Sequence, residues 1–225
     1  MKKIIITAAV ISAISTSSAF AKTEGSYVGL DILRSSIDVK SKSDNSDDNT
    51  FAPEYYTHKQ KDSGYGVGVS YKHAFNFDKF FIAPGVSYSF INNEAKSSYS
   101  TSSSDPYSQS VKLNNQLTLQ ANFGYDVTDQ FAFYVPVGVS SFGYEIKTSD
   151  VYGASSVRSK KTGRESSAFY GLGFSYQPVK NWLVSLEYNR FQDLKLTSAQ
   201  ATLNEGKIKA NIGIEQIKLG VSYGF

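Results

Sequence analysis

The sequence contains no cysteine, one methionine and two histidines, His58 and His73. The absence of cysteine excludes a disulfide scaffold and a zinc site built on thiolates, and two histidines offer little for a histidine-based metal site. No segment has the run of about 20 apolar residues that a membrane-spanning helix needs, and the mean hydropathy is −0.29. A formal net charge of +3 is too small to indicate a nucleic-acid partner. We therefore expect no metal, no cofactor and no bundle of membrane-spanning helices.

The first 21 residues have the features of a bacterial secretion signal. Lys2 and Lys3 precede an apolar segment at 4–14, and Ala19-Phe20-Ala21 matches the small-residue pattern of a cleavage site. The alternative, a membrane anchor, is disfavoured because the apolar segment is too short to span a bilayer. We therefore predict an exported protein whose mature domain covers residues 22–225.

The mature chain is rich in Tyr, Phe and Gly, which favours β-structure, and its apolar residues recur with a period of two. The clearest segment is 111–125, where polar residues occupy one face. The other face is apolar, with Asn115 as its one exception: Val111, Leu113, Leu117, Leu119, Ala121, Phe123 and Tyr125. A row of amide side chains opposite a long apolar row is typical of a strand with lipid on one side and a polar lumen on the other.

Similar segments predict eight strands, near 26–38, 63–74, 80–91, 111–125, 131–146, 167–177, 182–192 and at the C-terminal end. Short connections at 76–79, 127–130 and 178–181 alternate with long polar ones at 39–62, 92–110, 147–166 and 193–206. This alternation is typical of outer-membrane barrels. We predict an all-β fold: an eight-stranded antiparallel up-and-down transmembrane β-barrel with short periplasmic turns and long extracellular loops.

Four places break the pattern. Apolar residues at 208–214 have the opposite parity to those from 217 onward, which predicts a β-bulge near Glu215 and Gln216. A similar switch lies between Val139 and Phe142, and Pro84 and Pro136 predict a bulge or distortion. Aromatic residues near the strand ends, Phe81 and Phe191 among them, are expected in the girdles at the membrane surfaces.

Four charged residues are predicted to face the lumen: Asp31, Lys72, Glu187 and Lys218. An eight-stranded barrel is about filled by its own side chains, and unpaired charges there are costly. We expect Glu187, Lys218 and Asp31 to form a buried ionic cluster that plugs the lumen. The alternative is a set of unpaired polar residues in water.

The chain ends in a polar residue, a glycine and two aromatics, Lys218, Gly220, Tyr223 and Phe225. This ending resembles the signal that the barrel-assembly machinery reads. With the segments 25–30 and 67–72, residues 22–225 resemble the small outer-membrane barrels of the OmpX, Ail and opacity-protein type, and are most similar to the rickettsial surface adhesins. The resemblance implies attachment to host cells or binding of host serum and matrix proteins such as vitronectin. Partners expected with it are membrane lipid, lipopolysaccharide, the assembly machinery and a host surface or serum protein, and we expect a monomer.

The predicted loop 147–166 is the strongest candidate for ligand binding, because its cations outnumber its carboxylates. The candidate residues are Lys147, Tyr152, Arg158, Lys160, Lys161 and Arg164. Such a loop could bind anionic glycans, acidic protein segments or lipopolysaccharide phosphates. An equal alternative is that it only meets lipopolysaccharide head groups.

We find no catalytic constellation and expect no enzyme. Lipid A deacylases resemble a barrel with a His-x-Ser pair, but neither histidine here is followed by that spacing. Asp47, Asp48 and His58 mimic only loosely the site of omptin proteases, and the acidic segment 44–49 lacks the calcium-binding EF-hand spacing. The alternative to an adhesin is a small porin-like or purely structural barrel.

Overall fold

The computed structural model describes residues 23–42, 57–100, 106–152, 155–197 and 209–225. The predicted secretion signal and the acidic segment 44–49 lie outside these residues. The described residues contain no helix that is long and apolar enough to cross a membrane. They form nine strands: β1 (Gly25–Lys42), β2 (Thr57–Phe77), β3 (Phe80–Ser100), β4 (Pro106–Asp126), β5 (Phe131–Tyr152), β6 (Ser155–Val179), β7 (Trp182–Phe191), β8 (Leu194–Thr197) and β9 (Lys209–Gly224).

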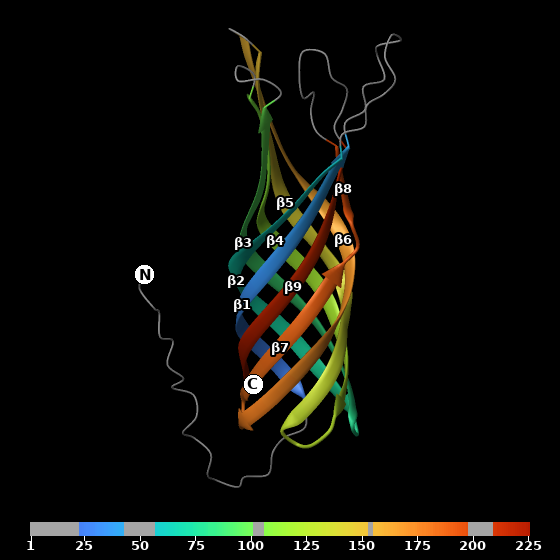
Figure 1. The fold of residues 1–225 in the computed structure, drawn as a ribbon. Coiled ribbons are helices and arrows are strands. Elements are labelled where there is room, and N and C mark those ends of the chain that lie inside the picture. The colour runs from blue at the N-terminus through green and yellow to red at the C-terminus, as the bar shows by residue number, and fades with distance from the viewer. Residues whose placement is uncertain (1–22, 43–56, 101–105, 153–154, 198–208) are drawn as a thin grey trace, which may run out of the picture.

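The strands form one closed antiparallel ring. Consecutive strands pair from β1 to β7, β7 pairs with β9, and β9 pairs with β1. β7 and β8 are parts of one barrel strand, because both pair with β9 and only Gln192 and Asp193 separate them. In Figure 1 the strands slant around the wall, and the short connections lie at its lower end. The predicted eight-stranded antiparallel barrel is confirmed.

The hairpins extend well beyond the predicted strand ends. β6 has 25 residues and begins at Ser155, whereas the sequence predicted a strand from 167. Pairing of β5 with β6 continues to Tyr152 and Ser155, and pairing of β3 with β4 continues to Ser100 and Pro106. The predicted loops 92–110 and 147–166 are therefore mostly strand.

An apolar belt surrounds the half of the barrel next to the short turns. Leu30, Leu119 and Leu219 point outward from β1, β4 and β9 and are 70%, 62% and 47% exposed. The predicted outward face of 117–125 is correct. Phe81 and Phe191 are exceptions to the predicted girdles, because both are buried inside the barrel.

Above this belt the polarity of the wall is inverted. In β9, Ile217, Leu219 and Val221 point outward, while Ile212 and Ile214 are buried inside. The register of β9 with β1 is continuous over this stretch, so the bulge predicted near Glu215 and Gln216 is absent. The outward positions become polar and the inward positions become apolar, which is the pattern of a strand that leaves lipid for water.

The inversion also explains the switch seen in β5. Val139 points outward and Phe142 inward, so β5 keeps its alternation. The register shift lies in β4 instead, between Leu113 and Asn115. Val111 and Leu113 were predicted to face outward, but this shift turns them into the interior, where both are buried.

Pro84 and Pro136 each interrupt the pairing of their strand with one neighbour. In both places the register is the same before and after the gap. The missing backbone N–H of proline removes ladder hydrogen bonds without adding a residue. The predicted distortion is therefore present, but neither proline makes a bulge.

The upper half of the barrel separates into two packed sheets. Pairing of β2 with β3 stops at Tyr65 and Asn92, and pairing of β6 with β7 stops at Phe169 and Phe191. One arm then holds β1, β2, β8 and β9, and the other holds β3 to β6 (Figure 1). They enclose an apolar upper core: Leu33, Ile37, Val39, Ile91, Ala95, Val111, Leu113, Phe142, Tyr144, Ile146, Phe169, Phe191, Leu194, Leu196, Ala210, Ile212 and Ile214.

Candidate functional site

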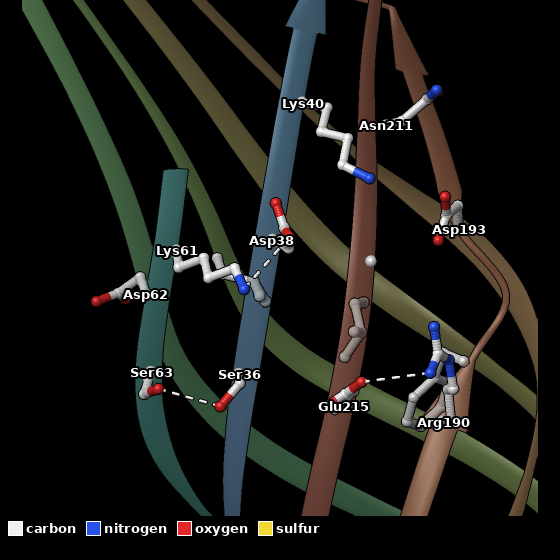
Figure 2. Close-up of a pocket in the computed structure, with 14 residues that line it drawn as sticks. Ser36, Asp38, Lys40, Lys61, Asp62, Ser63, Arg190, Asp193, Asn211 and Glu215 are labelled. Atoms are coloured by element: carbon white, nitrogen blue, oxygen red, sulfur yellow. Dashed lines mark hydrogen bonds and ion pairs between the residues drawn. The ribbon is translucent and has the colours of Figure 1, made fainter. Parts of the chain in front are cut away.

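The first arm carries a charged cleft of about 610 Å³ on its outer face (Figure 2). Two of its three cations pair with carboxylates on neighbouring strands. Lys61 Nζ lies 3.9 Å from Asp38 Oδ2, and an Arg190 guanidinium nitrogen lies 3.8 Å from Glu215 Oε1. Because both signs of charge alternate here, the cleft shows no preference for a ligand of one sign.

The second arm carries a basic recess of about 470 Å³. The register places one row of neighbouring residues across β3, β4, β5 and β6: Lys96, Ser110, Lys147 and Lys160. Arg158 adds a fourth cation to the lining, and the remaining lining residues are Ser108, Gln109, Thr148, Ser149 and Ser159. The lining thus contains four cations and no carboxylate.

Two carboxylates beside the recess hold its lysines in place. Glu145 lies between Lys147 and Lys160, with Nζ–Oε distances of 2.7 and 2.8 Å. Hydrogen bonds from these two ammonium groups lower the pKa of Glu145 to about 2. Glu94 lies 3.3 Å from Lys96. Arg158 has no ion pair or hydrogen bond with any described residue, so the recess keeps an excess of positive charge.

The residues predicted to bind ligand do not all come together. Lys147, Arg158 and Lys160 line the recess. Arg164 instead donates hydrogen bonds to Asn115 Oδ1 at 2.8 Å and to the Ser141 carbonyl at 3.1 Å. Lys161 alternates with Lys160 along β6, so it lies on the opposite face of the strand, and it is half-buried. The side chain of Tyr152 lies outside the described part of the structure.

Sequence reasoning missed Lys96, which comes from β3. The sequence places Glu94 and Lys96 in what was predicted to be a loop. Their alternation with Ala95, which is buried, was the available signal that β3 continues there.

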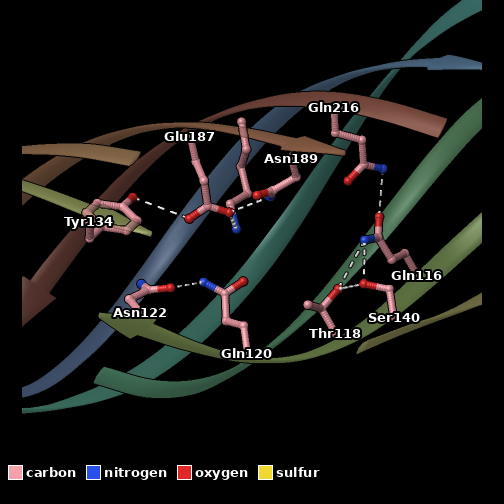
Figure 3. Close-up of polar contacts among 10 residues, drawn as sticks. Gln116, Thr118, Gln120, Asn122, Tyr134, Ser140, Glu187, Asn189 and Gln216 are labelled. Carbon is pink, nitrogen blue, oxygen red and sulfur yellow. Dashed lines mark hydrogen bonds and ion pairs between the residues drawn. The ribbon is translucent and has the colours of Figure 1, made fainter. Parts of the chain in front are cut away.

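In the lower half of the lumen, a buried ion pair joins two neighbouring strands (Figure 3). Lys218 Nζ lies 2.9 Å from Glu187 Oε1, and the two residues are directly opposite in the register of β7 and β9. Asn189 donates a hydrogen bond to Glu187 Oε1 at 2.6 Å, and Tyr134 donates one to Oε2 at 3.3 Å. Every oxygen of the buried carboxylate therefore has a partner.

Asp31 lies in the same layer but does not touch the pair directly. It is 5% exposed, and its Oδ2 has no hydrogen-bond partner among the described residues. Asp31, Lys72, Glu187 and Lys218 line a common cavity of about 30 Å³. A space of this size holds about two water molecules, so this part of the lumen is nearly filled.

Further layers close the lumen above and below the ion pair. Above it, Gln216 donates a hydrogen bond to Gln116 Oε1 at 2.9 Å, which joins β9 to β4 across the interior (Figure 3). The apolar upper core follows. Below it, the lower core fills the short-turn end: Tyr27, Ala74, Phe81, Ala83, Ala132, Tyr134 and Leu183.

The glycine and the two aromatic residues of the predicted assembly signal lie on or beside β9. Gly220 points inward, and a Cβ there would lie 2.5 Å from Asp31 Oδ1 and 2.8 Å from Ser185 Oγ. Tyr223 and Phe225 point outward and are 46% and 73% exposed. Any larger residue at 220 would displace the side chains of Asp31 and Ser185, while the aromatic residues stay accessible on the outer face.

A family model described as "Outer membrane protein beta-barrel domain" matches residues 6–225. The chain belongs to this family. It is therefore a bacterial outer-membrane protein, its apolar belt meets lipid, and its upper half lies outside the cell. None of the curated proteins matches the sequence.

Solved structures with the same fold are distant in sequence. OprG of Pseudomonas aeruginosa is 13% identical over 92% of this chain and 100% of that chain, with a TM-score of 0.51. The attachment invasion locus protein Ail of Yersinia pestis is 15% identical over 90% and 99%, with a TM-score of 0.40. Neisserial surface protein A is 16% identical over 89% and 97%, with a TM-score of 0.41. At these identities the likeness concerns the fold alone.

Proposed function

We propose that this protein is an adhesin that binds host-cell, serum or matrix proteins through the extracellular half of its barrel. The basic recess on the β3–β6 arm carries the proposal. It agrees with the resemblance to rickettsial surface adhesins, for which vitronectin-like ligands are expected. Partners in the membrane would be lipid and lipopolysaccharide.

The recess suits recognition of an acidic protein surface. Its cations come from three strands of one sheet, so the backbone ladder fixes their spacing before a ligand arrives. Arg158 has no partner among the described residues, and serine and threonine hydroxyls beside it can donate further hydrogen bonds. Complementary charge at such a surface raises the association rate and sets specificity.

Binding is favoured over conduction by the contents of the lumen. The apolar upper core, the Gln116–Gln216 layer and the Glu187–Lys218 pair succeed one another along its axis. A porin-like path would have to cross all of these layers. Among the described residues, no group of three or more His, Cys, Asp or Glu side chains could hold a metal ion.

The proposal is tested with cells that display the protein and with purified vitronectin as the probe. Reversing Arg158 and Lys160 to Glu should reduce vitronectin capture by at least tenfold and remove its salt sensitivity. The matched control reverses Lys79 and Lys180, which are exposed at the short-turn end and face the periplasm. Equal capture by both double variants at equal surface expression would contradict the proposal.

A further inference from the structure

The upper part of β6 has an edge that no described strand pairs with. Its last backbone hydrogen bond toward β7 runs from the Gln192 N–H to the Ala168 carbonyl at 2.9 Å. Beyond this point β6 pairs with β5 alone. Among the described strands, β8 lies near the other side of β6 but does not pair with it. An unpaired strand edge offers a ready template for another extended chain.

The alternation of a strand identifies the backbone groups on this edge. Because the Ala168 carbonyl points toward β7, the N–H and C=O groups of every second residue before it point the same way. These residues are Arg158, Lys160, Thr162, Arg164 and Ser166, and all five are exposed. From 158 to 166 they span about 27 Å of strand.

The other edges of the two arms are shorter or already covered. On β3, the Glu94 N–H donates a hydrogen bond to Asp62 Oδ2 at 3.2 Å, and Asn92 and Asn93 pack closely over Gly64 of β2. β8 offers four residues only. The β6 edge is therefore the longest accessible template in the described part of the barrel.

The charge of this edge restricts what can pair with it. Between 158 and 168 the edge positions carry three cations, Arg158, Lys160 and Arg164, and no carboxylate. Cations on an exposed edge discourage pairing with ordinary or basic strands, and they repel the same edge of a second copy. An extended segment with acidic side chains would gain both ladder hydrogen bonds and charge pairing.

We propose that the β6 edge, residues 158–166, binds an acidic extended segment of a partner protein by strand addition. This inference rests on the proposed adhesin function and specifies its mode of contact. The basic recess lies on the adjacent outer face, since Arg158 and Lys160 belong to both. The partner would thus bind through main-chain pairing at the edge and through side-chain charge in the recess.

The test uses the full-length barrel in lipid nanodiscs and a synthetic twelve-residue peptide of alternating Thr and Glu. Thr162→Pro removes an N–H from the open edge and leaves the β5–β6 ladder intact, a position where strands tolerate proline. It should weaken peptide binding at least tenfold. Thr162→Ala, the matched control, keeps the N–H and should bind within threefold of the parent. A peptide of alternating Thr and Lys should not bind.

Amide hydrogen exchange provides a second measurement, and pairing of side-chain charges alone would not change it. Bound peptide should slow exchange at the amides of Thr162, Arg164 and Ser166. Unchanged binding by Thr162→Pro, no binding by the parent, or unchanged exchange would overturn strand addition. If Thr162→Pro weakens peptide binding as expected but cells that display this variant capture vitronectin as well as the parent, the partner does not bind by strand addition, so that inference falls and the adhesin proposal stands. Loss of capture in the Arg158 and Lys160 reversal with retained peptide binding would support the adhesin proposal and contradict the charge pairing proposed at the β6 edge.

Discussion

Replacing Lys218 by Met should destabilise the barrel, because it leaves Glu187 buried without its cation. Glu187 is 2% exposed and lies 2.9 Å from Lys218 Nζ. Methionine has a similar length, so the change removes charge with little change in volume. The hydrogen bonds from Asn189 and Tyr134 to the carboxylate would remain.

The expected loss follows from the cost of breaking a buried pair, about 3–5 kcal/mol. Since two hydrogen bonds to Glu187 survive, we expect a value near the lower limit, about 3 kcal/mol. At a urea slope of about 1–3 kcal/mol/M this lowers the unfolding midpoint by about 1–3 M. Removing both charges, with Glu187→Gln and Lys218→Met together, should restore stability to within about 1 kcal/mol of the parent.

Reversible urea unfolding in lipid vesicles measures this, with fluorescence of Trp182, the one tryptophan of the chain, as the signal. Heat-modifiability on gels gives a second readout. Lys180→Met, at an exposed turn position, is the control and should have no effect. A midpoint for Lys218→Met equal to that of the parent, or a double variant as unstable as the single one, would refute the reasoning.

Three further predictions concern the core, the basic recess and the lumen. Leu113→Ala should cost about 3–5 kcal/mol by urea unfolding, because Leu113 is fully buried; an effect no larger than that of the lipid-facing Leu119→Ala would contradict this. The Glu145 carboxyl, whose pKa is lowered to about 2 by Lys147 and Lys160, should stay ionised from pH 7 to pH 3 by carbon NMR. The ion pairs of Glu145 therefore stabilise the hairpin at every pH above the pKa of Glu145 in the unfolded chain, and this stabilisation is lost as pH falls through about 2. A titration midpoint of the Glu145 carboxyl near 4.5 would be inconsistent with the ion pairs. In planar bilayers the barrel should show no steady conductance, and stable open channels would mean that the lumen layers are not closed.

The sequence predicted the lower half of the barrel well, because one physical rule holds there along every strand. Outward residues meet lipid and inward residues meet a polar lumen, so parity alone places Leu119 outside and Lys218 inside. The opposition of Glu187 and Lys218 followed from counting residues from the turns. The sequence placed Asp31 in the right layer, but it did not predict the cavity that Asp31 lines together with the ion pair.

The upper half was mispredicted because a period of two does not tell which face is inside. In β9 the apolar residues change parity between Ile214 and Ile217, and a bulge was the simplest interpretation. The structure shows that the strand is regular and that its surroundings change. The basic recess was found only in part, since Lys96 joins Lys147 and Lys160 through strand pairing that parity does not reveal.

The inversion of polarity along β9 is the central claim, and the chain, which has no cysteine, allows a direct measurement. Single cysteines at 210–221, spin-labelled in lipid vesicles, report collisions with oxygen in lipid and with a nickel chelate in water. We predict oxygen access at 217, 219 and 221, nickel access at 211, 213 and 215, and little access to either at 210, 212 and 214. Oxygen access at 210, 212 and 214 would mean that these residues face lipid through a bulge, and would contradict the account.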